Sequence, residues 1–252
     1  MNISICIIAG DEQINIERCL KSCLWADELI VVDSYSKDKT FEIAKKYTDK
    51  VYKREWTGYR DQKNYVLSLA KGEWVLSIDA DEEISDELQK EIISEINKQD
   101  TKDGYKIPRL SFYQGKWIKH SGFYPDYQLR LFKRKNAKWI GDRVHERIDI
   151  NGDIGKLTND IFHYPYKGSI SGMDRTADEY SSLQANELYN QGKRYNIFLL
   201  IFRPAFKFFE IFFLKLGFLD GMPGFIIATI SSYSMFLRYV KLRETENNNE
   251  GQ

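Results

Sequence analysis

The chain has 252 residues, enough for one large domain or for one domain with an appendage. Its 37 basic and 37 acidic side chains cancel, so the global positive field expected of a nucleic-acid-binding protein is absent. Hydrophobic residues make up 42% of the chain, which is inconsistent with wholesale disorder. The three cysteines have no zinc or redox spacing and are expected to be reduced thiols of a cytosolic protein. No signal peptide is expected, because the first residues lack a basic region and their apolar run is short.

The first 100 residues alternate between short apolar runs and segments with helical spacing. Runs rich in β-branched residues predict strands at 3–9, 28–33, 50–53 and 73–79. Apolar residues three or four apart predict helices at 13–24, 36–47, 60–70 and 85–98. This alternation indicates a parallel sheet covered by helices on both faces. Such sheets bind ligands beyond the carboxyl ends of their strands, where Asp33 and Asp79 fall.

From about residue 100 the composition changes. Residues 105–148 are aromatic and basic and contain prolines and glycines, a pattern that predicts strands and loops. Residues 172–190 are typical of a polar helix, whereas residues 196–242 are rich in phenylalanine. The polar tail RETENNNEGQ is expected to be disordered.

The stretch WVLSIDADEEIS places four carboxylates directly after a buried strand. In an extended segment Asp79 and Asp81 point the same way, roughly 6–7 Å apart along the chain. That arrangement suits a hard divalent cation, Mg²⁺ or Mn²⁺, shared with substrate phosphates. The alternative is a solvated loop in which acidic residues such as Glu83 and Asp86 favour the dipole of the next helix.

Four motifs follow one another along the first 150 residues: AGDEQINIERCLKS, ADELIVVDSYSKDKT, KNYVLSLAKGEWVLSIDADEE and QLRLFKRKNAKWIGDRVHE. Together they resemble the inverting family 2 glycosyltransferases, and among these the small bacterial enzymes that extend lipopolysaccharide core or related surface glycans. The later segment GFLDGMPGFIIATISSYSMFLRYVKL is similar to the C-terminal part of that subgroup. The resemblance implies a GT-A fold, a nucleotide-sugar donor, a divalent metal, and a glycolipid or oligosaccharide acceptor.

The resemblance also implies roles for individual residues on the donor side. Asp33 would contact the nucleotide base, Asp79 would face the ribose side, and Asp81 would hold the metal against the diphosphate, with Asp79 as its neighbour in the metal motif. Asn64 matches a frequent donor-site position, although an exposed helical asparagine explains it equally well. Glu12 belongs to the donor pocket, but the usual Asn-Glu pair is Asp-Glu here. Tyr35 replaces a residue that is usually small, so the identities of the base and the sugar stay open.

The acceptor side must supply a base. Displacing a nucleoside diphosphate builds charge that a cation can stabilise, and a carboxylate or imidazole must take the proton of the attacking hydroxyl. Glu146 in VHE is the first choice, with His145 contacting the diphosphate or the metal, and Asp126 is the second choice. A structural ion pair with a nearby arginine is the alternative for both carboxylates. Arg130, in a basic cluster with residues 133–135, would bind a phosphorylated acceptor or the donor diphosphate, unless the cluster is a solvated charge run.

The segment 197–218 contains eight phenylalanines and four charged side chains, Arg203, Lys207, Glu210 and Lys215. It has too many charges for a transmembrane helix. Helices lying in the membrane interface fit this pattern better. A homodimer interface and a lid over the catalytic core are the alternatives.

The expected fold class is therefore α/β, a GT-A domain with a Rossmann-like, mostly parallel sheet flanked by helices and a C-terminal amphipathic helical extension. Four parts are expected: a nucleotide-sugar-binding half at 1–100, an acceptor-side half at 101–190, a membrane-associating or oligomerisation segment at 191–243, and the disordered tail at 244–252.

The expected function is metal-dependent, inverting transfer of a sugar, with glucose as a candidate, from a UDP-sugar to a hydroxyl of a lipopolysaccharide-core or other glycolipid acceptor. The protein would lie in the cytoplasm, peripheral on the inner face of the cytoplasmic membrane. One rival is a sugar-phosphate nucleotidyltransferase, which should show a glycine-rich loop where AGDEQIN has a single glycine. The other is a catalytically silent membrane-bound scaffold, which would not need three aspartates at strand ends.

Overall fold

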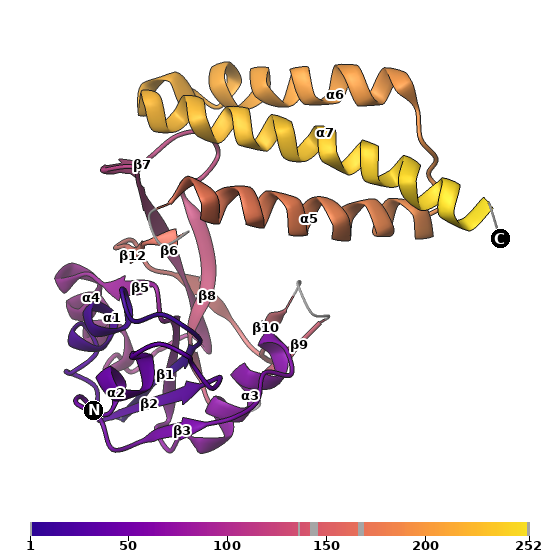
Figure 1. Ribbon diagram of the computed structural model, residues 1–252. Coiled ribbons are helices and arrows are strands. Elements are labelled where there is room, and N and C mark those ends of the chain that lie inside the picture. The colour runs from indigo at the N-terminus through magenta and orange to yellow at the C-terminus, as the bar shows by residue number, and fades with distance from the viewer. Residues whose placement is uncertain (1, 136, 142–145, 166–168, 251–252) are drawn as a thin grey trace. The chain divides into compact units, whose positions relative to one another are not determined.

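The structure is a computed structural model that describes residues 2–135, 137–141, 146–165 and 169–250 (Figure 1). The chain divides into two compact units. The first unit comprises Met1–Leu110 and Pro125–Tyr164, and the second unit comprises Ser111–Tyr124 and Pro165–Gln252.

The first unit contains a sheet whose first half is parallel, as predicted. Its parallel strands are β1 (Ile3–Ala9), β2 (Glu28–Asp33), β3 (Val51–Lys53) and β4 (Trp74–Asp79), in the order β3-β2-β1-β4. The sheet continues beyond β4 with antiparallel strands, first β8 (Asp126–Lys133) and then β6 (Gly104–Tyr113). The remaining strands of this unit on the sheet are β5 (Glu82–Ile84), β11 (Ile154–Lys156) and β12 (Ile161–His163). Strand β7 (Lys116–Ile118), which pairs with the last residues of β6, belongs to the second unit. The mostly parallel, helix-flanked sheet that the sequence predicts is thus confirmed.

Helices cover both faces of this sheet. They are α1 (Ile16–Lys21), α2 (Thr40–Ala44), α3 (Tyr59–Leu69) and α4 (Asp86–Ile96). The first, second and fourth contribute to one apolar cluster, and α3 contributes to another. Helix α4 begins where the sequence predicts, because the Ser85 hydroxyl accepts a hydrogen bond from the Leu88 amide.

Alternate residues of β1 enter opposite clusters, as expected for a strand buried on both faces. Ile3, Ile5 and Ile7 pack in the first cluster, while Cys6 and Ile8 pack in the second. Each fully buried isoleucine contributes about 1.5–3 kcal/mol relative to an exposed one. The close packing of β1 on both faces holds its carboxyl end, where the candidate site lies, in place.

All three cysteines lie in the first unit and are buried free thiols: Cys6, Cys19 and Cys23. Burial raises the pKa of the Cys6 and Cys19 thiols well above the ordinary value for cysteine. Cys6 and Cys19 are therefore packing groups rather than nucleophiles.

The second unit is mainly helical, with α5 (Ile170–Asn190), α6 (Ile197–Phe209) and α7 (Met222–Glu250). Helix α7 packs against both α5 and α6, and the three helices run side by side in Figure 1. A π-helical turn (Glu210–Leu214) and a 3₁₀ turn (Gly217–Asp220) connect α6 to α7. None of the helices among the described residues has a stretch apolar enough, over sufficient length, to span a membrane.

Helix α7 continues through residues 244–250, for which the sequence composition predicted disorder. The Thr245 hydroxyl donates to the Lys241 carbonyl at 2.9 Å, and the Glu246 carboxylate accepts a hydrogen bond from the Tyr195 amide. The second contact joins residues far apart in the chain, so composition alone could not reveal it.

The buried Asp220 carboxylate organises the turn before α7. It accepts hydrogen bonds from the Lys119 amide at 3.2 Å, the His120 amide at 3.1 Å and the Ser121 hydroxyl at 3.0 Å. It also lies 3.0 Å from Nδ1 of the His120 ring. These contacts tie the loop after β7 to the start of α7, and because several donors share the buried charge, its desolvation is compensated.

Candidate active site

A cavity of about 450 Å³ lies in the first unit at the carboxyl ends of β1 and β4. It is lined by Ile8, Ala9, Gly10, Asp11, Glu12, Ser34, Trp56, Tyr59, Asp79, Ala80, Asp81 and His163. This is the edge of the sheet where ligands are expected in such folds. Two of the aspartates that the sequence singles out, Asp79 and Asp81, border it.

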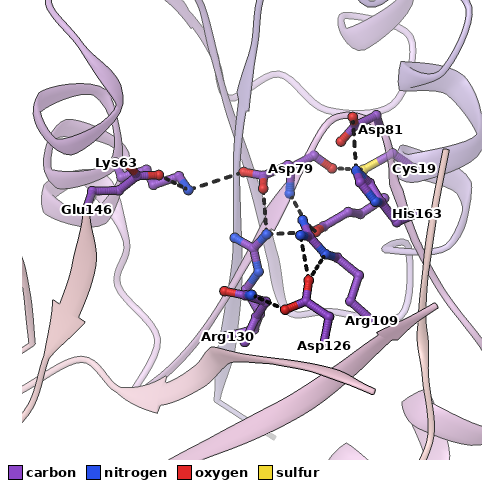
Figure 2. A network of polar contacts seen from close by, with 11 residues as sticks. Cys19, Lys63, Asp79, Asp81, Arg109, Asp126, Arg130, Glu146 and His163 are labelled. Atoms are coloured by element: carbon purple, nitrogen blue, oxygen red, sulfur yellow. Dashed lines mark hydrogen bonds and ion pairs between the residues drawn. The ribbon is translucent and has the colours of Figure 1, made fainter. Parts of the chain in front are cut away.

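Asp79 faces two cationic side chains of the protein. Its Oδ1 is 3.4 Å from Nζ of Lys63, and its Oδ2 is 2.5 Å from a guanidinium nitrogen of Arg130 (Figure 2). Burial alone would raise the pKa of Asp79, but the charges of Arg130 and Lys63 hold it well below its usual range. Asp79 is therefore ionised, and it fixes two positive groups beside the cavity.

The buried charges continue away from the cavity as a chain of ion pairs. Glu82 has a fully buried side chain, accepts from Arg130 at 2.7 Å and lies 3.3 Å from Arg109. Arg109 in turn donates to Asp126 from two nitrogens, at 2.9 and 2.6 Å (Figure 2). Asp126, the second-choice base, is thus held in an ion pair with an arginine, which is the alternative that the sequence left open.

Arg130 stands apart from the rest of its basic cluster. Its side chain is buried in the ion-pair chain, whereas Lys133 contacts Asp103 and Arg134 donates to the Gly72 carbonyl. Its guanidinium is already engaged by two carboxylates.

Asp81 lies beside a histidine that sequence reasoning did not select. Its Oδ2 is 3.5 Å from Nε2 of His163, and both side chains line the cavity. Pairing of β12 with β5 brings His163 opposite Glu82, and the Tyr164 amide donates to the Asp81 carbonyl at 2.9 Å. The sequence feature that could have pointed to His163 is its position at the end of the short run IFH. The pairing of its strand with β5, about 80 residues earlier, cannot be recognised from the neighbouring sequence.

Two of the residues expected to contact the sugar donor, Asp33 and Asn64, form hydrogen bonds within the protein. Asp33 is fully buried, and its carboxylate accepts from both the amide and the hydroxyl of Ser36, at 3.1 and 2.5 Å. Asn64 hydrogen-bonds the backbone of Trp139. Glu12 does line the cavity, and its Oε2 accepts from Asn15 at 2.9 Å.

Glu146, the first-choice base, is mostly buried and lies 3.2 Å from Nζ of Lys63. Lys63 therefore stands between Asp79 and Glu146, which brings Glu146 to the same group of charges as the end of β4 (Figure 2). Sequence reasoning missed Lys63, although it directly precedes Asn64 in a quoted motif. His145, expected to contact the diphosphate or the metal, lies outside the described residues.

Comparisons with known proteins identify the family of the chain. The family model described as Glycosyl transferase family 2 matches residues 4–151. An uncharacterized glycosyltransferase of Rickettsia typhi is 38% identical over 254 residues, covering 96% of this chain and 87% of that protein. The lipopolysaccharide core biosynthesis glycosyltransferase LpsC of Rhizobium meliloti is 27% identical and covers 95% of this chain and 91% of its own length.

A solved structure shows the same fold. The crystal structure of S. aureus TarS 1–349 in complex with UDP matches with a TM-score of 0.51 and 17% identity, covering 100% of this chain and 92% of that one. The family match favours a glycosyltransferase over the nucleotidyltransferase and the silent scaffold that the sequence left as rivals. The chain belongs to glycosyltransferase family 2, and it has the GT-A fold that the sequence predicts.

Proposed function

We propose that the protein is an inverting, divalent-cation-dependent glycosyltransferase that moves a sugar from a UDP-sugar to a hydroxyl of a glycolipid acceptor, with lipopolysaccharide core as the acceptor class. The observation that carries this proposal is the cavity at the ends of β1 and β4, bordered by Asp79, Asp81 and His163. TarS has been crystallised with UDP, which makes UDP the first nucleotide to test. The similarity to LpsC supports the acceptor class.

Asp81 and His163 would hold the cation. Among the described residues no group of three potential metal ligands occurs, but Asp81 Oδ2 and His163 Nε2 lie 3.5 Å apart, close enough to bind one cation together. A carboxylate oxygen and an imidazole nitrogen fit Mn²⁺ or Mg²⁺ when substrate phosphates and water complete the coordination. A cation bound there would stabilise the negative charge that develops on the leaving diphosphate. Asp79 contributes by keeping Lys63 and Arg130 in place beside the cavity.

Glu146 would act as the base that takes the proton of the acceptor hydroxyl. Its carboxylate forms an ion pair with Lys63 through Oε1. Asp126 suits the role less well, because it accepts two hydrogen bonds from Arg109 and a third from Gln128 at 2.7 Å. Inversion requires only this one displacement, with no covalent nucleophile.

The metal and the base are tested with purified protein by UDP calorimetry and by sugar-transfer assays. Mn²⁺ should strengthen UDP binding to the wild type, and Asp81→Asn should lose both this dependence and turnover. Asp153→Asn, at an exposed carboxylate, is the matched control. Full activity in excess EDTA would refute the metal role.

Glu146→Gln should bind UDP normally and lose transfer by about 10²-fold or more, the scale of general-base removal. If Asp126→Asn shows that phenotype and Glu146→Gln does not, Asp126 is the base.

The second unit would bind the membrane surface through the apolar face of α6 and the turns that follow it. The most exposed apolar side chains of this region are Phe198 and Phe202 on α6, Leu214 in the π-helical turn and Met222 at the start of α7, each at least 60% exposed. Transferring such surface from water gains about 25 cal/mol per Å². The basic side chains Arg203 and Lys215, which are also exposed, add attraction to anionic headgroups. A lipid-linked acceptor would be reached from the inner face of the cytoplasmic membrane.

Flotation with anionic liposomes tests this binding on the full chain. Wild-type protein should float, and Phe198→Asp combined with Phe202→Asp should stay at the bottom of the gradient. Leu183→Asp, at an exposed position of α5, should float like the wild type. If the wild type does not float and is instead a dimer that the double variant dissociates, the face is a homodimer interface.

A further inference from the structure

We infer that helix α3 positions the base: Asn64 and its neighbours on α3 hold the hairpin that carries Glu146, and Asn64 does not bind the donor. This inference rests on the proposed role of Glu146. The main residue is Asn64. Its side chain hydrogen-bonds the backbone of Trp139, and Asn64 is not among the residues that line the cavity.

The hairpin is a separate piece of structure. Strands β9 (Lys138–Ile140) and β10 (Arg147–Asp149) pair with each other in a two-stranded sheet of their own. Within the described part of the chain they have no ladder to the main sheet. An isolated two-stranded ribbon is marginally stable in water, so its position must come from side-chain contacts.

Asn64 supplies the most specific of these contacts. Its Nδ2 donates to the Trp139 carbonyl at 2.8 Å, and the Trp139 amide donates back to its Oδ1 at 3.0 Å. A carboxamide carries both a donor and an acceptor, so it can pair with a backbone residue as a neighbouring strand would. The Trp139 side chain is buried in the same apolar cluster as Val66 and Leu67 of α3. Asn64 therefore fixes both the position and the register of β9.

Two further contacts come from the same face of α3, at positions three or four residues apart. The Arg60 guanidinium donates to the Gly141 carbonyl at 3.3 Å, at the end of β9. Nζ of Lys63 lies 4.6 Å from the centre of the Trp139 ring and 3.2 Å from Glu146. Residues i, i+3 and i+4 share one side of a helix, so a single turn of α3 contacts both β9 and Glu146, the residue before β10.

The position of Trp139 is transmitted to Glu146 through the hairpin. Ile140, which follows Trp139, pairs with Arg147, which follows Glu146. A shift of β9 away from α3 therefore moves the carboxylate as well. A general base must lie within about 2.6–3.2 Å of the proton it takes, and a misplacement of about 1 Å can cost 10²-fold in rate.

The experiment compares Asn64→Ala with the wild type in the full-length protein. Transfer kinetics, UDP affinity with Mn²⁺ by calorimetry, and hydrogen exchange of the peptide that includes Trp139 are measured together. Asn97→Ala is the matched control, because its Nδ2 donates to a backbone carbonyl at the exposed end of α4. If Asn64→Ala does not fold, Asn64→Asp replaces it, since it keeps an acceptor for the Trp139 amide and replaces the donor to the Trp139 carbonyl by a carboxylate oxygen.

We expect kcat to fall by about 10²-fold, UDP affinity to stay within twofold, and exchange at Trp139 to accelerate. The control should match the wild type in all three measurements. Weakened UDP binding would assign Asn64 to the donor pocket and overturn the inference, and so would an unchanged kcat. A wild type that transfers no sugar would refute the proposed function instead. In that case hydrogen exchange still decides whether Asn64 holds the hairpin.

Discussion

Arg130→Met should destabilise the first unit severely, because it removes the central cation of the buried ion-pair chain. The Arg130 side chain is 5% exposed and binds Asp79 and the fully buried Glu82 at 2.5 and 2.7 Å. Removing one partner of a buried pair leaves an uncompensated charge and costs about 3–5 kcal/mol. Here two carboxylates lose that partner, and Lys63 and Arg109 compensate them only in part.

The cost should appear as a fall in the melting temperature of about 6–20 °C, from about 2–4 °C per kcal/mol for a unit of this size. Tryptophan fluorescence can follow the transition, since Trp74 and Trp139 are buried in the first unit. Lys102→Met, which removes an exposed ion pair with Asp153, should change stability by less than about 0.5 kcal/mol. A loss below 1 kcal/mol in Arg130→Met would refute the reasoning and show that water solvates these carboxylates.

The same variant should change how stability depends on pH. The pKa of Asp79 lies below its unfolded value of about 3.9, because Arg130 and Lys63 outweigh the effect of burial. A depressed pKa contributes stability that is present above the unfolded value and is lost as pH falls below it. Wild-type protein should therefore lose stability steeply below about pH 4, and Arg130→Met should show a shallower slope there.

Three smaller perturbations test other parts of the molecule. Gly224→Ala should destabilise the second unit by at least about 1–3 kcal/mol in urea unfolding, because its Cβ would lie 1.9 Å from the Gly217 carbonyl oxygen. An unchanged midpoint would mean that this backbone contact relaxes freely. Asp220→Ala should cost a similar amount and speed hydrogen exchange of the Lys119 and His120 amides, which it leaves without their carboxylate acceptor. Unchanged exchange there would contradict its role in the turn. Burial and a hydrogen bond to Glu83 raise the pKa of Tyr164 to about 12 in the folded protein, above the value of 10 for an unperturbed tyrosine. The neutral phenol therefore stabilises the fold fully below pH 10, and this contribution is lost as pH rises from 10 toward 12. Tyr164→Phe should remove this loss of stability at alkaline pH. If the variant and the wild type depend on pH identically, Tyr164 does not cause the loss.

Local patterns were sufficient for the parallel half of the sheet. Strands such as β1 and β2 are short apolar runs rich in β-branched residues, and their burial on both faces follows from that composition. The cavity at their carboxyl ends follows from the general geometry of such sheets. The family resemblance supplied the remaining expectations about the reaction.

The partners of the charged residues could not be predicted, because they depend on pairings distant in the chain. The sequence indicated that something cationic belongs beside Asp79, and the structure places Arg130 there from a strand 51 residues later. His163 reaches Asp81 only because β12 pairs with β5. No periodicity or local motif encodes either pairing.

The division of the chain into two units could not be predicted from the sequence either. Strand β6 reads as one continuous segment, yet residues up to Leu110 belong to the first unit and those from Ser111 to the second. The last residues of the strand pair with β7, whereas the earlier ones pair with β8. The change of partner within a strand leaves no mark on its composition.

The buried cysteines can report on opening of the first unit. Because Cys6, Cys19 and Cys23 are the only cysteines of the chain and all belong to that unit, a thiol reagent can label the protein only when the unit opens. The labelling rate of the unmodified protein would then measure the free energy of that opening, without an introduced probe and without a signal from the helices of the second unit. Since Cys19 Sγ lies 3.5 Å from the carbonyl oxygen of Asp79, a ligand that tightens the cavity would slow its labelling, so one thiol reaction could serve as a binding assay before any sugar or acceptor is known.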